Sequence, residues 1–165
     1  MKFRFLALLA LVLGMASCQK DTYGLDVDAN GEAAVTLNVA LPDDATRAAG
    51  TDSAMGGINN VDLANAYDIR YILEVYDENG VLAKKRMAHT TDATTTSFSF
   101  RLIPGRAYNF VVWADFVPEG EGTADYHYNT NEDNGGLRKV EVIKGKWDVI
   151  DESRDAYTDV VTVHD

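Results

Sequence analysis

Apolar and polar residues alternate in several short segments of the chain, a pattern typical of half-buried β-strands. In residues 33–41, "AAVTLNVAL", every second position from Val35 is apolar, and Pro42 ends the run. Residues 67–77 alternate in the same way, and one face carries Ile69, Tyr71, Leu73 and Val75. The dipeptide Asn79-Gly80 follows, so we expect a β-hairpin closed by a tight type I′ turn.

Four further segments show strand-like alternation, and turn residues separate them: 95–103, 107–116, 137–143 and 156–163. The dipeptide Pro104-Gly105 between the first two suits a type II turn. No segment keeps a helical period. About seven short antiparallel strands therefore predict an all-β fold, a two-sheet β-sandwich with little helix, because a single sheet would leave its apolar face in water.

The N-terminus, "MKFRFLALLALVLGMASC", carries two basic residues, then an apolar run, then small residues before Cys18. This order is typical of a secretory signal peptide, and the apolar run is too short to span a bilayer. Small residues followed by cysteine resemble a bacterial lipobox, in which the cysteine is acylated and becomes the first mature residue. An ordinary secretory signal is the alternative. We expect a signal peptide at 1–17, an acidic flexible tether at 18–32 and one β-sandwich domain at 33–165.

Charge and cysteine content narrow the class of protein further. The 165 residues include 15 Lys and Arg against 26 Asp and Glu, a net charge of −11. Removal of residues 1–17 would leave 13 basic against 26 acidic residues, a net charge of −13. Such a surface argues against nucleic-acid binding, which needs clustered basic residues. The single cysteine excludes an internal disulfide, so the fold must depend on its core.

Candidate catalytic and metal-binding residues are few. His89, His127 and His164 are far apart in the sequence and lack partners at metal-ligand spacing. No nucleophile elbow or phosphate-binding loop occurs, so we expect a non-catalytic protein without metal or cofactor. The tether contains "DVDANG", the first half of a calcium loop, but Leu37 stands where the closing Glu should be, which favours an acidic linker.

A second acidic segment, residues 115–136, admits two interpretations. Its carboxylates could bind calcium, but a solvated loop is the interpretation we favour; they include Asp115, Glu119, Glu121 and Asp125. Aromatic residues near predicted strand ends also admit two interpretations. They could form a platform on which sugars stack, or they could pack in the core and at its rim, as aromatic residues in strands usually do. The candidate stacking residues are Trp113, Trp147, Tyr126 and Tyr128.

Three stretches, "YILEVYDENG" (71–80), "RLIPGRAYNFVVWADF" (101–116) and "DESRDAYTDVV" (151–161), together resemble the N-terminal domain of fimbrillin-like surface lipoproteins of anaerobic Gram-negative bacteria. This branch is known mainly as a domain of unknown function. The resemblance implies a transthyretin-like β-sandwich. It also implies cleavage by an extracellular Arg-specific protease after the first strand, which opens a groove that a strand of a neighbouring subunit fills. The matching position in this sequence is Arg47.

The expected function is that of a lipid-anchored protein of the outer membrane, facing the cell surface, which serves as a fimbrial or adhesive subunit. Its partners would be the membrane, through the lipid on Cys18, and other subunits or surface ligands. Polymerising members usually carry a second domain, whereas this sequence ends at Asp165, so polymerisation stays open. The alternative is a stand-alone module that binds a glycan or a protein at the cell surface.

Overall fold

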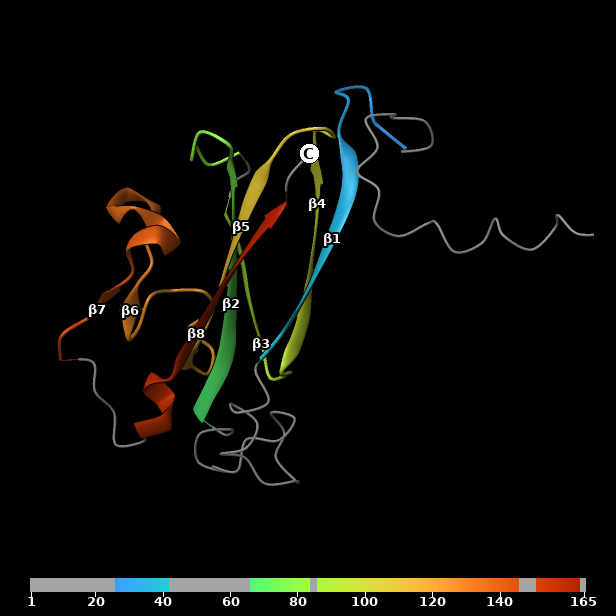
Figure 1. Cartoon of the computed structure of the whole chain (residues 1–165). Helices are drawn as coiled ribbons and strands as arrows, with labels where there is room; N and C mark the ends of the chain where they lie inside the picture. Colours follow the sequence, from blue (N-terminus) through green and yellow to red (C-terminus); the bar gives the residue numbers. More distant parts are fainter. Residues whose placement is uncertain (1–25, 42–65, 84–85, 146–150, 164–165) are drawn as a thin grey trace, which may run out of the picture.

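The computed structural model describes residues 26–41, 66–83, 86–145 and 151–163 (Figure 1). Cys18, Arg47 and Trp147 lie outside these residues. Within these described ranges, eight strands and three short 3-10 helices make up the regular structure. The strands are β1 (Ala33–Ala40), β2 (Tyr67–Asp77), β3 (Met87–Thr91), β4 (Thr95–Leu102), β5 (Tyr108–Pro118), β6 (Tyr128–Asn129), β7 (Glu141–Val142) and β8 (Ala156–Val163); the 3-10 helices are η1 (Glu132–Asn134), η2 (Gly136–Lys139) and η3 (Asp151–Arg154).

All strand pairs are antiparallel, so the prediction of an antiparallel all-β protein is confirmed. The largest sheet has four strands in the order β3-β2-β5-β8. Strands β1 and β4 form a two-stranded sheet, and β6 and β7 form another. Figure 1 shows the β1–β4 pair beside one face of the four-stranded sheet and the β6–β7 pair on the other side.

One face of the four-stranded sheet packs against β1 and β4 and forms the first apolar core. The faces predicted from the alternation in β2, β4 and β5 are those that meet here. The buried residues of this core are Leu41, Tyr67, Ile69, Tyr71, Leu73, Val75, Phe98, Leu102, Tyr108, Phe110, Val112, Ala114 and Phe116. Val35, Leu37 and Val39 of β1 pack against it but are only half-buried. In the β1–β4 layer, β4 is thus more deeply buried against the sheet than β1.

The opposite face of the same sheet is also buried. A second apolar cluster joins β2 and β5 to η2, and its buried residues are Ile72, Tyr76, Val111, Trp113 and Leu137. Almost every residue of β2 and β5 is therefore buried, whichever face it occupies. The segment between β5 and β8, which contains β6, η1, η2 and β7, supplies the cover for this second face.

The turn after β2 differs from the predicted type I′ turn. The Gly80 N–H donates to the Asp77 carbonyl at 2.9 Å, which places Glu78 and Asn79 at the centre of the turn. Gly80 itself has φ 74°, and the Asp77 N–H donates to the Val81 carbonyl at 2.8 Å. This is a three-residue loop with glycine in the left-handed position, a common alternative to the two-residue turn. The hairpin was predicted correctly, but its turn type was wrong.

Two predicted boundaries also change. The strand expected over residues 137–143 is mostly a 3-10 helix, η2, followed by the short strand β7. Residues 26–32, which the sequence places in the tether, form a turn attached to the domain. In it Asp28 Oδ1 accepts from the Glu32 N–H, and Arg101 Nε lies 2.9 Å from Asp28 Oδ2. The hydrogen bond within the turn and the ion pair between Asp28 and Arg101 attach residues 26–32 to strand β4.

Candidate functional site

Arg70 occupies the centre of the second face. It lies on β2 directly opposite Asp115 on β5. Its Nε and Nη2 donate to the two carboxylate oxygens of Asp115 at 2.8 and 2.5 Å, and neither side chain is exposed to solvent. Its Nη1 donates to Asp125 Oδ1 at 2.7 Å and to the Thr123 carbonyl at 3.2 Å. The guanidinium thereby joins the sheet to the segment that covers it.

These contacts contradict the interpretation of residues 115–136 as a solvated loop at Asp115 and Asp125, whereas Glu119 and Glu121 are exposed as that interpretation predicts. Asp115 belongs to strand β5 and is buried, and Asp125 is held by Arg70 and by Thr130, whose N–H and hydroxyl both donate to it. Burial opposes the charged form of Asp125, but the hydrogen bonds from Thr130 and Arg70 outweigh it and hold the pKa of this carboxyl below its usual value. Burial likewise opposes the charge on Arg70, and the bonds to Asp115 and Asp125 raise its pKa nevertheless. Asp115 and Asp125 therefore serve the fold.

A second buried charge, Glu74, lies on the same face of β2. Its Oε2 accepts from the Leu137 N–H at 2.8 Å and from the Tyr76 hydroxyl. Burial and the contact with Glu74 raise the pKa of Tyr76 to about 12. Arg86 Nη1 lies 3.7 Å from Glu74 Oε1, and its guanidinium also donates to the carbonyl and the hydroxyl of Thr130. We call Arg70, Glu74, Arg86, Asp115 and Asp125 the buried charge network.

Sequence reasoning missed this network, although β2 carries a signal of it. Arg70 and Glu74 are the charged residues inside an otherwise apolar run, and both stand on the face that the alternation assigned to solvent. A charged residue is seldom buried without a partner, so such positions are exposed unless a partner meets them. The partner, Asp115, becomes evident only when the register between β2 and β5 is known.

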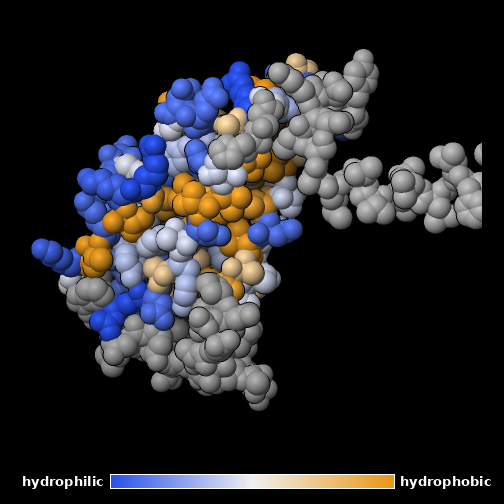
Figure 2. All heavy atoms as spheres, viewed as in Figure 1, coloured by the Kyte–Doolittle hydropathy of each residue, from blue (hydrophilic) through white to orange (hydrophobic). Residues whose placement is uncertain are grey.

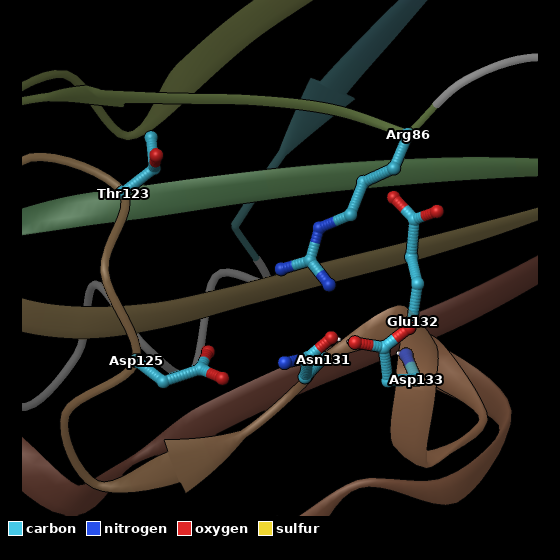
Figure 3. A pocket seen from close by; sticks show the side chains of 6 residues that line it. All are labelled: Arg86, Thr123, Asp125, Asn131, Glu132 and Asp133. Atoms are coloured by element: carbon cyan, nitrogen blue, oxygen red, sulfur yellow. Dashed lines mark hydrogen bonds between the residues drawn. The ribbon is translucent and has the colours of Figure 1, made fainter.

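An open polar pocket of about 410 Å³ lies at the rim of this network (Figure 3). Arg86 reaches between Asp125 and Thr123 on one side and Asn131, Glu132 and Asp133 on the other. Part of this polar surface is already used, since Asp125 accepts from Arg70 and Asn131 Oδ1 accepts from the Asp133 N–H at 3.0 Å. No cluster of three His, Cys, Asp or Glu in the described residues is arranged to hold a metal ion. The pocket offers charged and hydrogen-bonding groups.

The candidate stacking residues lie in different environments. Trp113 is 8% exposed, belongs to the second apolar cluster, and meets Tyr128 edge-on with ring centroids 5.2 Å apart. The Tyr128 hydroxyl donates to the Arg154 carbonyl, and Tyr126 packs against the first core. A ring enclosed in this way offers no face for a sugar. The positions of Trp113 and Tyr128 therefore favour packing over stacking.

In the described part of the fold, strand β1 is held to the first core along one edge only. It pairs with β4 over eight residues, and its other edge has no strand partner among the described residues. Its inward side chains are half-buried, whereas Leu41 directly after it is buried, and the Leu41 N–H donates to the Thr94 carbonyl at 2.9 Å. Residue 47 follows shortly after this point, outside the described residues. A strand held on one side only is easier to remove than β2 or β5.

Comparison with known proteins places the chain in a family. Residues 27–164 match a family of unknown function, DUF6562. The chain belongs to this family. The match begins within the turn at 26–32 and ends after β8, in agreement with the extent of the fold. No curated protein and no solved structure gives a significant match. The family description assigns no activity, so a function must be argued from the site itself.

Within the described residues, no helix has the length and apolar character that crossing a bilayer requires.

Proposed function

We propose that this chain is a non-catalytic, lipid-anchored surface protein of the fimbrillin type, with a transthyretin-like β-sandwich whose first strand is exchanged. Cleavage after Arg47 would free β1, and an extended segment of a neighbouring subunit would take its place beside β4. The observation that carries the proposal is the attachment of β1. Among the described strands β1 pairs with β4 alone, apart from a bridge between Ala33 and Val27 in the turn before it, and its inward side chains Val35, Leu37 and Val39 are half-buried.

The energy of burial supports exchange at β1. Complete burial of a Val or Leu side chain stabilises by about 1.5–3 kcal/mol, so Val35, Leu37 and Val39, which are partly buried, each contribute the larger part of this amount. Because β4 pairs with no other described strand, loss of β1 would leave β4 without a strand partner and uncover Phe98 and Phe100. An apolar slot beside a free strand edge favours the addition of another strand.

The rest of the domain has its own sources of stability. Strands β2 and β5 pair over eleven residues and are buried on both faces. The buried charge network ties the segment after β5 to the second face, on the opposite side of the sheet from β1. Removal of β1 would therefore open the first core without releasing the second. This is what a subunit that exchanges one strand needs.

The order of residues in the chain connects anchoring with exchange. The proposed lipid on Cys18 precedes β1, and Arg47 follows it. Cleavage after Arg47 would leave the lipid attached to a fragment that holds the domain without a covalent link, through the β1–β4 pairing, the packing of β1 and Leu41 on the first core, and the turn at 26–32. Exchange of β1 for a neighbour's strand would then transfer the domain from the membrane to the assembly.

The experiment treats the full chain with an Arg-specific protease and identifies the products by mass spectrometry. We expect a single early cut, with Ala48 as the new N-terminal residue, and a remainder that still unfolds cooperatively. Arg47→Lys should abolish the cut. Arg106→Lys is the matched control, because Arg106 lies in an exposed turn of the described fold and should not affect the product.

A second step tests the exchange itself. A synthetic peptide of residues 33–41 should bind the cleaved protein once its own β1 fragment has been removed, and the same peptide with Leu37→Asp should bind at least tenfold more weakly. Cleavage elsewhere, loss of the folded remainder, or equal binding of both peptides would contradict the proposal.

A further inference from the structure

Strand β8 is an edge strand of the four-stranded sheet. It pairs with β5 on one side, and its second edge has no strand partner among the described residues. Three valines of this strand are exposed: Val160 by 57%, Val161 by 41% and Val163 by 41%. Figure 2 shows an apolar band on the face of the molecule across which β8 runs in Figure 1. A long, apolar, unpaired edge is a template for pairing with another strand.

The hydrogen bonds of β8 show which backbone groups face outward. Asp159 pairs with Val112 of β5, and the Thr158 hydroxyl donates to the Val112 carbonyl at 3.0 Å, so Val112 turns its carbonyl toward β8. The Val160 N–H instead donates to Asp159 Oδ1 at 2.8 Å, the carboxylate of its own neighbour. Because backbone groups alternate in direction along a strand, the outward N–H and C=O groups belong to Thr158, Val160 and Thr162.

We propose that a second copy of this chain occupies this edge, with the two β8 strands antiparallel and a two-fold axis at Val160. The pairing joins the two four-stranded sheets into one of eight strands. In it each Val160 exchanges two backbone hydrogen bonds with the Val160 of the other copy. Such an interface uses the same surface twice, the usual arrangement in dimers.

Charge and length select this register among the alternatives. A shift by one residue would place the outward-facing N–H and C=O groups of one copy opposite residues of the other copy whose N–H and C=O groups already bond to β5. A shift by two in one direction would set Asp159 against its own copy, and like charges directly opposite are destabilising. A shift by two in the other direction would reduce the paired segment within Ala156–Val163 from seven residues to five. The register centred on Val160 keeps seven residues and separates the carboxylates.

Side chains match on both faces in this register. On the second face, Thr158 stands opposite Thr162 of the other copy, on either side of the valine pair, and cross-strand Thr pairs can hydrogen-bond. On the first face, Asp159 stands opposite Val161, and Tyr157 opposite Val163. Each copy thus covers exposed valines of the other. The edge of β8 carries no other charge, so nothing along it would favour a partner of opposite sign over a second copy.

Asp159 limits the pairing, because its carboxylate holds the Val160 N–H that the partner strand must take. Asp159→Ala removes the cost of breaking this hydrogen bond, about 0.7–1.4 kcal/mol. It should therefore lower the dissociation constant of the dimer by roughly three- to tenfold. Both copies are acidic, so added salt should also strengthen the dimer. This dimer does not depend on cleavage after Arg47.

The first test measures the mass of the full chain by sedimentation velocity across a range of concentrations in a mild detergent. We expect a monomer–dimer equilibrium that Val160→Lys abolishes. Val142→Lys is the matched control, because Val142 is 52% exposed on β7, away from this edge, and should leave the dimer intact. Both variants should unfold at nearly the same temperature as the parent. A monomer at every concentration, or a dimer that survives Val160→Lys, would overturn the proposal.

The second test fixes the register in a chain with Cys18→Ser. Hydrogen-bonded antiparallel pairs have Cα atoms about 5.5 Å apart, within the range that a disulfide spans. Val160→Cys should therefore give a covalent dimer on mild oxidation, whereas Val142→Cys should not. Thr158→Cys should cross-link to Thr162→Cys in a mixture and not to itself. Self-linkage of Thr158→Cys, or equal cross-linking at 142 and 160, would contradict the axis at Val160.

Discussion

Arg70 and Asp115 face each other across β2 and β5, with both carboxylate oxygens bound by the guanidinium and with both side chains closed off from solvent. Removal of Asp115 would leave the buried guanidinium with Asp125 as its remaining charged partner and with Nε and Nη2 unpaired. We expect Asp115→Ala to lower the free energy of unfolding by about 3–5 kcal/mol. Chemical denaturation of the full chain, followed by circular dichroism, measures this loss.

The double variant Arg70→Met/Asp115→Leu is the informative comparison. It removes both charges and keeps apolar volume, so it should be less destabilised than Asp115→Ala, even though Asp125 then loses Arg70 as well. If the double variant lost as much free energy of unfolding as Asp115→Ala, the ion pair would stabilise the fold more than apolar side chains of similar volume do.

Gly136 permits the approach of η2 to Glu74. A Cβ at this position would lie 2.5 Å from Glu74 Oε1, and the backbone has φ 61°. Gly122 has almost the same φ, 62°, but nothing lies within 4 Å of its would-be Cβ. Gly122→Ala should therefore cost only the backbone strain, about 1–2 kcal/mol, and Gly136→Ala should cost about 1–3 kcal/mol more. Equal losses in thermal or chemical unfolding would refute the close contact.

Acid should weaken the buried charge network through Asp125. Hydrogen bonds hold the pKa of Asp125 in the folded protein below the unfolded value of 3.8, so the unfolded chain takes up the proton first as the pH falls. The stability that this carboxylate contributes is complete above about pH 5 and is lost as the pH falls through the folded pKa. Unfolding measured between pH 6 and pH 3 should show a steeper loss for the parent than for Asp125→Asn. If the stability of the parent and of Asp125→Asn fell in parallel with pH, the Asp125 carboxylate would not contribute to stability in this way.

Trp113 should act as a packing residue. Trp113→Ala removes a large buried ring from the second apolar cluster and should cost about 3–5 kcal/mol of stability. Trp113→Phe should cost less, because most of the cavity is filled again. If either variant kept full stability and lost binding on a glycan array, the stacking interpretation would return.

The alternation of side chains was sufficient to locate the first core. Ile69, Tyr71, Leu73 and Val75 face β1 and β4 as their spacing predicts, and Phe98 and Leu102 meet them from β4. The prediction was correct because alternate residues of a β-strand lie on the same face, so the spacing of these apolar residues fixes which face is buried.

The second face could not be predicted in the same way. The segment that covers it is rich in Gly, Asp and Asn and has short strands and 3-10 helices in place of a clear period. The polar contacts that attach it, such as Arg70 to Asp125, join residues 55 positions apart in the sequence. Composition alone therefore favoured a solvated loop. Burial of charge in this segment depends on pairing across β2 and β5, which only the three-dimensional arrangement reveals.

The central claim is that β1 can leave the domain while the four-stranded sheet stays folded. Hydrogen exchange of backbone amides in the intact, uncleaved chain tests it most directly, because opening of one element and global unfolding have different free energies. We predict that the amides of β1 exchange as a unit, at a clearly lower free energy than those of β2 and β5. Exchange of β1, β2 and β5 together, only on global unfolding, would contradict the account.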